Sequence, residues 1–128
     1  MSLSILIAEK NQFTATEYDK ILRRHGHKTT IAKDGLECLE KYQSELKKSK
    51  SESDKTPFDA VVLDQSMSEK ACFHVAERIL EVKPTQRIIF SSTYAMTKNQ
   101  DTKHLENKIG FLPKPFSLDA FVQKIESN

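Results

Sequence analysis

The stretch FDAVVLDQSM, residues 58–67, contains a short, continuous apolar run at Ala60–Leu63 that ends abruptly in Asp64. Two further runs, Ile5–Ala8 and Ile88–Phe90, are also rich in β-branched residues and do not alternate with polar ones. This pattern is typical of strands that are covered on both faces, as in a parallel sheet. The sequence therefore predicts a buried central strand that is followed directly by an acid.

Weaker strand patterns lie at Lys28–Ala32, which is typical of an exposed edge strand, and at Phe111–Pro113. Helical patterns separate the strands. Thr14 and Glu17 match a capping box, which predicts a first helix that begins at Thr14 and stops near Gly26.

Three more helices are expected: one after the Asp34-Gly35 turn, one that ends before Pro84, and one that begins near Ser117. The segment Thr97–Lys108 has thin apolar content, and we expect a loosely packed helix there. Residues 47–57 contain no apolar side chain and are expected to form a polar loop insertion. The repeated alternation of strands and helices predicts a doubly wound α/β fold with a parallel sheet.

Composition excludes several classes of protein. The 128 residues are expected to form a single domain, 1–128, and the net charge of +2 is too small to indicate a nucleic acid partner. The two cysteines lack metal-binding spacing, and no apolar run is long enough to span a membrane, so we expect a cytoplasmic protein. With only three glycines and no glycine-rich phosphate loop, a flavin- or nucleotide-binding enzyme is disfavoured.

Chemically active side chains follow the predicted strands. Glu9 and Lys10 follow the first strand, Asp64 follows the third, residues 91–93 (Ser-Ser-Thr) follow the fourth, and Lys114 follows the last. Because parallel sheets of this kind gather their chemistry at the carboxyl ends of the strands, these groups are expected to converge. The convergence of an acid, a hydroxyl and a lysine on one edge of the sheet is the strongest functional signal in the sequence.

The chain resembles the receiver domains of two-component response regulators, including the single-domain chemotaxis regulators. The segments that carry the resemblance are ILIAEKN, HGHKTTIAKDGLECLE, FDAVVLDQSM, IIFSSTYA and GFLPKPFSLDAF. The resemblance implies a flavodoxin-like fold with five parallel strands in the order 2-1-3-4-5 and five helices.

The resemblance also implies roles for individual residues. Asp64 would accept a phosphoryl group, Ser92 would hydrogen-bond that group and act as a switch, and Lys114 would pair with Asp64 and then with the phosphate. Phe111 occupies the position of the switch aromatic. In the family the peptide bond before Pro115 is cis, although trans is the usual state of an X–Pro bond.

The sequence departs from the family at the metal site. The implied Mg²⁺ ligands are Glu9, Asp64 and the backbone carbonyl of Ser66, but Lys10 stands where the family has a second acid. We expect Mg²⁺ binding to be weak or absent, because the added positive charge repels the cation. Lys10 could swing outward, or its ammonium could take the place of the metal; the second arrangement is favoured here.

These features predict a stand-alone receiver in a phosphorelay, because the final helix ends at Asn128. The expected partners are a histidine kinase or phosphotransfer protein and a downstream protein that binds the face of the fourth helix, fifth strand and fifth helix. A homodimer is also allowed, and no membrane or nucleic acid partner is expected. The chain is not expected to be an enzyme beyond self-catalysed phosphorylation and hydrolysis at Asp64. The alternative is a phosphorylation-independent pseudo-receiver, an interaction module with impaired Mg²⁺ binding.

Overall fold

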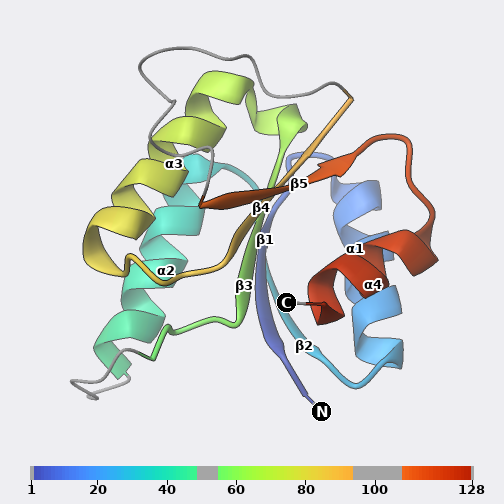
Figure 1. Ribbon diagram of the computed structural model, residues 1–128, viewed down its shortest axis with the longest axis horizontal. Coiled ribbons are helices and arrows are strands. Elements are labelled where there is room, and N and C mark those ends of the chain that lie inside the picture. Colours follow the sequence, from blue (N-terminus) through green and yellow to red (C-terminus); the bar gives the residue numbers. More distant parts are fainter. Residues whose placement is uncertain (1, 49–54, 94–107, 128) are drawn as a thin grey trace.

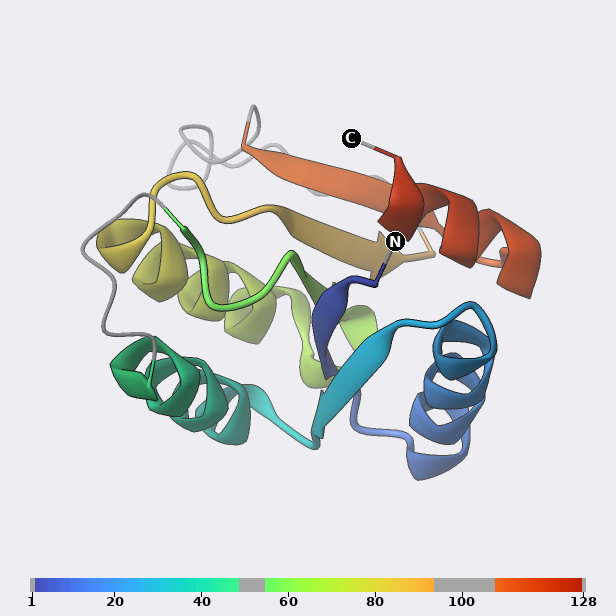
Figure 2. The same ribbon diagram turned by 90° about the horizontal axis from the view of Figure 1, so that it is seen from below.

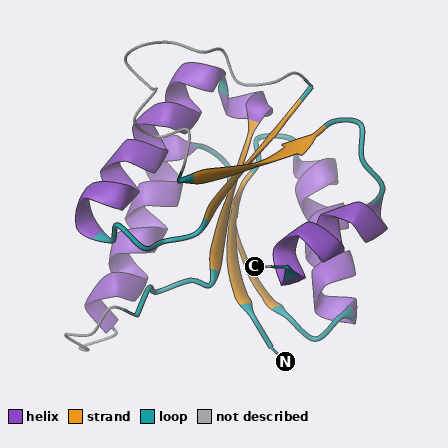
Figure 3. Ribbon diagram, viewed as in Figure 1, coloured by secondary structure: helices purple, strands orange, loops and turns teal. Residues whose placement is uncertain are grey.

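The computed structural model describes residues 2–48, 55–93 and 108–127 of the chain. The strands are β1 (Ser4–Ala8), β2 (Lys28–Ala32), β3 (Ala60–Asp64), β4 (Ile88–Ser92) and β5 (Ile109–Pro113). The α-helices are α1 (Gln12–Arg24), α2 (Gly35–Lys48), α3 (Glu69–Val82) and α4 (Leu118–Glu126), and a short 3₁₀ helix, η1 (Gln65–Met67), follows β3 (Figures 1 and 3).

The strands form one parallel sheet in the order β2-β1-β3-β4-β5, which confirms the predicted topology. The structure describes four α-helices where five were expected. The missing one is the helix predicted at Thr97–Lys108, and residues 94–107 lie outside the described part of the chain. The helix counted as fifth from the sequence is therefore α4.

Helices cover both faces of the sheet, with α2 and α3 on one face and α1 and α4 on the other (Figures 1 and 2). Alternate strand residues contribute side chains to two separate hydrophobic cores, because successive side chains of a strand point to opposite faces. Leu6, Leu63 and Phe90 pack with α2 and α3. Ile7 and Val62 pack with α1 and α4. The apolar runs are thus continuous because both faces of the sheet are buried.

The ends of the helices correct two predictions. The N-cap of α1 is Asn11, whose Oδ1 accepts a hydrogen bond from the backbone N–H of Thr14, so α1 begins earlier than the capping box indicated. The helix α2 extends to Lys48, so the first two residues of the predicted loop insertion are helical. Gly26 has φ of +86°, a left-handed conformation that suits a glycine after the end of a helix, as predicted.

The C-terminal end of α4 contacts residues at the amino-terminal ends of the strands. The guanidinium of Arg87, just before β4, donates to the carbonyl oxygens of Ile125 and Lys124. Nε2 of buried His27 lies 2.8 Å from Oε2 of Glu126. The two Arg87 hydrogen bonds satisfy carbonyl groups that a helix leaves without partners at its C-terminus, and the His27 contact holds the side chain of Glu126.

Candidate functional site

The predicted convergence is present at the carboxyl edge of the sheet. Glu9 directly follows β1, Asp64 ends β3, Ser91 lies near the end of β4, and Lys114 directly follows β5. Glu9, Asp64 and Ser91 are buried, and the Lys114 side chain is 26% exposed. The parallel arrangement brings these residues together because all five strands end at the same edge.

Asp64 accepts hydrogen bonds on both carboxylate oxygens. Its Oδ1 lies 2.7 Å from Nζ of Lys114 and accepts from the Ser91 hydroxyl at 2.5 Å. Its Oδ2 accepts from the backbone N–H of Ser66 at 2.8 Å, a contact that also caps the N-terminus of η1. The carboxylate is therefore held by three donors while it is completely buried.

These donors decide the charge of Asp64. Burial by itself would raise the pKa of Asp64, but hydrogen bonds from Lys114, Ser91 and the Ser66 N–H outweigh it and hold the pKa below its usual value. Asp64 is consequently ionised at neutral pH. An ionised carboxylate is the form that can act as a nucleophile.

Glu9 lies in a less favourable setting. Its Oε2 accepts from the Ser66 hydroxyl at 2.6 Å and from the backbone N–H of Asn11 at 3.0 Å. Its Oε1 is buried and has no hydrogen-bond partner. Burial raises the pKa of Glu9, against the two hydrogen bonds, and the charge of Asp64 raises it further. The unpartnered oxygen marks a point that would favour a proton or a cation.

Ser66 links the two acids. Its backbone N–H donates to Asp64, its hydroxyl donates to Glu9, and the same hydroxyl oxygen accepts from the backbone N–H of Lys10 at 3.1 Å. The side-chain hydroxyl of Ser66 thus has a definite role, whereas the sequence pointed only to its backbone carbonyl.

The structure does not place the Lys10 ammonium between Glu9 and Asp64. Lys10 is exposed and lines an open cavity of about 450 Å³ together with Lys33 and Asp34. Among the described residues, Lys10 has no ion pair with either acid, and the cation in contact with Asp64 is Lys114. The outward arrangement of Lys10, which was the less favoured of the two, is the one observed.

The hydroxyl in contact with Asp64 belongs to Ser91 rather than to Ser92. Ser92 is the last residue of β4 and is also buried, and Phe111 is half-buried in β5 opposite Phe90. The sequence pointed to residues 91–93 together, and the family resemblance then indicated Ser92 rather than Ser91. The register of β3 and β4, which pairs Asp64 with Ser91, is the signal that identifies it.

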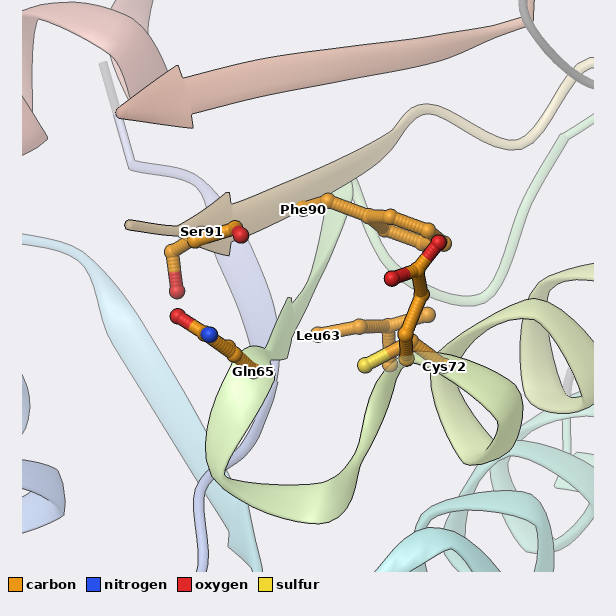
Figure 4. A pocket seen from close by; sticks show the side chains of 7 residues that line it. Leu63, Gln65, Cys72, Phe90 and Ser91 are labelled. Carbon is orange, nitrogen blue, oxygen red and sulfur yellow. The ribbon is translucent and has the colours of Figure 1, made fainter. Parts of the chain in front are cut away.

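A small cavity of about 10 Å³ lies beside this contact, between η1, α3 and β4. Figure 4 shows Ser91 and Gln65 on one side of this cavity and Leu63, Phe90 and Cys72 on the other. Gln65 also closes the edge of the site, because its Oε1 accepts from the backbone N–H of Thr93 at 2.8 Å. Asp64 is therefore covered in the conformation described here.

A wider groove of about 450 Å³ opens on the other side of Lys114. It runs between α1 and the connection from β5 to α4, which contains the cis peptide bond Lys114–Pro115. Tyr18 and Phe116 contribute aromatic surface, and their rings stack at 6.0 Å. Phe13, 76% exposed at the start of α1, also lines this groove. An apolar surface thus adjoins the lysine of the site.

The donor set can accommodate one hard cation on two carboxylates. Glu9 offers an unpartnered buried oxygen, and Ser66 hydrogen-bonds to both Glu9 and Asp64. Within residues 2–48, 55–93 and 108–127, no three His, Cys, Asp or Glu side chains gather as a metal cluster. Mg²⁺ is commonly bound by one or two carboxylates together with phosphate, so Glu9 and Asp64 are the described residues that could hold it.

Taken together, the fold and site define a doubly wound α/β domain with a buried, lysine-paired aspartate at the carboxyl edge of its sheet. A model of the response regulator receiver domain family matches residues 5–126. The chain belongs to this family. Receiver domains are generally signalling modules of two-component systems and not enzymes.

Comparisons with individual proteins agree with this assignment. The chain is 27% identical over 125 residues to response regulator RR06 of Streptococcus pneumoniae serotype 2 (strain D39 / NCTC 7466), covering 98% of this chain and 52% of RR06. It therefore spans about half the length of that relative.

Two solved structures share the fold. Chemotaxis response regulator CheY4 of Vibrio cholerae is 20% identical, with a TM-score of 0.73 and 98% of each chain covered. The receiver domain of sensor histidine kinase PA1611 from Pseudomonas aeruginosa PAO1, which holds a magnesium ion in its active-site cleft, is 19% identical, with a TM-score of 0.70 and 98% of this chain and 96% of that chain covered.

None of the helices in the described part of the chain is both long enough and apolar enough to cross a membrane.

Proposed function

We propose that Asp64 accepts a phosphoryl group from the phosphohistidine of a histidine kinase or phosphotransfer protein, and that the phosphorylated domain signals by contact with a further protein. The observation that carries this proposal is the buried Asp64 carboxylate held by Lys114 at 2.7 Å. A nucleophilic carboxylate needs a nearby cation to neutralise the charge that grows on the phosphoryl oxygens.

The phosphoryl transfer needs no further reactant. A carboxylate oxygen of Asp64 forms a bond to phosphorus, and the P–N bond of the donor breaks with its electron pair returning to the imidazole. Lys114 has to move from the carboxylate toward the new phosphoryl oxygens, since phosphorylation adds about 1.5 to 2 negative charges. Ser92 and Phe111 would respond to this group as switch residues.

We further propose that Mg²⁺ binds weakly at Glu9, Asp64 and the Ser66 carbonyl. When bound, the ion would supply positive charge next to the phosphoryl group. Within this chain, Glu9 would provide its unpartnered Oε1, and the outward position of Lys10 leaves the two acids available. The positive charge of Lys10 nearby would keep the affinity low.

A protein donor is supported by the groove beside Lys114. Phe13 and Leu118 expose apolar surface on its rim, and the groove leads directly to the lysine that contacts Asp64. Exposed apolar patches of this kind mark protein interaction sites. A helical histidine-bearing domain seated there would bring its phosphohistidine next to the acceptor. The downstream partner would bind the face formed by the predicted fourth helix, β5 and α4, of which the structure describes β5 and α4.

The test is incubation with acetyl phosphate and Mg²⁺, followed by intact-mass measurement. The wild-type protein should gain the mass of one phosphoryl group, and Asp64→Asn should not. A wild-type protein that gains no mass with any divalent cation, or from a panel of phosphorylated histidine kinases, would rule out Asp64 as an acceptor.

A second candidate is a phosphorylation-independent interaction module. The observation that favours it is the complete burial of Asp64, with three donors in place and Gln65 closed across the site. Titration with Mg²⁺ followed by amide NMR separates the two. Saturable shifts at Glu9 and Asp64 that vanish in Asp64→Asn support the acceptor, and their absence supports the interaction module.

A further inference from the structure

We propose that the side chain of Gln65 is a gate over the acceptor: in the closed position described here it keeps a phosphoryl donor away from Asp64, and it has to swing outward before transfer. This inference rests on the proposed function and adds a control of access to it. Gln65 directly follows Asp64 and begins η1, and the family resemblance assigns it no role.

The closed position is held by one contact between two segments of the chain. Oε1 of Gln65 accepts a hydrogen bond from the backbone N–H of Thr93 at 2.8 Å. Gln65 comes directly after β3 and Thr93 directly after β4, so this bridging hydrogen bond joins the carboxyl ends of two adjacent strands. Since Asp64 ends β3 and is the register partner of Ser91 on β4, the bridge crosses the edge of the sheet at the acceptor.

The space beside Asp64 is too small for the reaction. Asp64 is 0% exposed, and the cavity next to it, which Gln65 lines, has a volume of about 10 Å³ (Figure 4). A cavity has to offer about 10 to 15 Å³ to hold a single water molecule, whereas a phosphoryl group carries three oxygens around phosphorus. A donor can therefore reach the acceptor from this side only after a side chain has moved.

Gln65 is the side chain that can move at the lowest cost. Leu63, Phe90 and Ser91, which also line the cavity, are at most 1% exposed and belong to β3 and β4. Lys114 supplies the charge that the transfer needs, so it cannot leave beforehand. Gln65 is half-buried, and its opening breaks the bridging hydrogen bond, which favours the closed position by about tenfold.

The first arm of the test measures the rate of phosphorylation by acetyl phosphate with Mg²⁺. Because only open molecules react, loss of the bridging hydrogen bond should raise this rate. Gln65→Met, which keeps the length of the side chain but lacks the amide oxygen, should react about tenfold faster than wild type, and Gln65→Ala at least as fast as Gln65→Met. Gln43→Ala, at an exposed glutamine of α2, is the matched control and should leave the rate unchanged. A rate for both Gln65 variants equal to or below that of wild type would overturn the gate.

The second arm does not depend on phosphorylation. Amide hydrogen exchange of Thr93, followed by NMR, should become about tenfold faster in Gln65→Met, because the Thr93 N–H loses its acceptor. The N–H of Lys114, which donates to the carbonyl oxygen of Ser92 at 2.6 Å, should keep its exchange rate. Unchanged exchange at Thr93, or equal acceleration at both amides, would overturn the gate. Faster exchange at Thr93 in a protein that is never phosphorylated, as wild type or with either Gln65 substitution, would instead reject the proposed function.

Discussion

Replacement of Lys114 by Met should destabilise the fold strongly, because it removes the cation from a buried acid. Nζ of Lys114 lies 2.7 Å from Oδ1 of Asp64, which is completely buried, while the Lys114 side chain is 26% exposed. Loss of one partner of a buried ion pair costs about 3 to 5 kcal/mol. Since Ser91 and the Ser66 N–H remain as donors, we expect a loss near the lower end, about 3 kcal/mol in the free energy of unfolding.

The loss should depend on pH. In wild type the folded-state pKa of Asp64 lies below its ordinary value, so Asp64 stabilises the fold above that ordinary value and loses this contribution as the pH falls through the folded-state pKa. Without Lys114 the burial of Asp64 dominates and its pKa rises. Glu9, whose pKa Lys114 also lowers, shifts in the same direction. The cost of Lys114→Met is therefore largest near neutral pH and shrinks as the acids become protonated.

Urea unfolding followed by far-UV circular dichroism at neutral pH and near pH 4 measures this difference. Lys48→Met is the control, because the Lys48 ammonium lies 3.4 Å from Glu45 on the surface, with side chains 71% and 43% exposed. It should cost less than about 0.5 kcal/mol at either pH. Equal losses for the two variants, or a loss for Lys114→Met that does not change with pH, would refute the reasoning.

Three further predictions concern other parts of the structure. Ser68→Gly should raise the free energy of unfolding, measured by urea titration, by about 1 kcal/mol. Relief of backbone strain at φ of 84° outweighs the few tenths of a kcal/mol lost with the Ser68 cap of α3. A lower free energy of unfolding would contradict this prediction. Glu9→Gln should raise the unfolding midpoint at neutral pH, because the raised pKa makes the ionised Glu9 costly, and the gain should fade as acid protonates Glu9 in wild type. Arg87→Met should speed amide hydrogen exchange in α4 but not in α2, because two carbonyl oxygens at the end of α4 lose their donor; equal acceleration in both helices would count against it.

Much of the fold could be predicted from the sequence because its signals are local. The buried strands appear as unbroken apolar runs, since both faces of the sheet are covered, and β2 has the predicted bounds. Gly26 marks the end of α1 because glycine tolerates a positive φ, and Pro84 marks the end of α3 because proline cannot continue a helix. The capping box at Thr14 gave the wrong start for α1. The side chain of Asn11, three residues earlier, accepts from the backbone N–H of Thr14 and caps the helix there.

The site was only partly predictable. Acids and a lysine after strands are visible in the sequence, so Glu9, Asp64 and Lys114 could be named in advance. Ser91 could not be separated from Ser92, because the choice depends on which side of β4 faces Asp64 and hence on the register with β3. The side-chain role of Ser66 likewise depends on the turn that brings η1 against Glu9.

The sequence by itself determined the order of the elements, their burial and the set of charged groups at the carboxyl edge of the sheet, because these depend on residue type and on short-range periodicity. Only the tertiary structure decided which hydroxyl holds Asp64 and which amine neutralises it. Lys10 and Lys114 are chemically equivalent in the sequence, but the path of the chain after β1 exposes Lys10, whereas the turn after β5 directs Lys114 to within 2.7 Å of the acid. Contacts between residues 50 positions apart depend on strand register and backbone direction, which no local pattern contains.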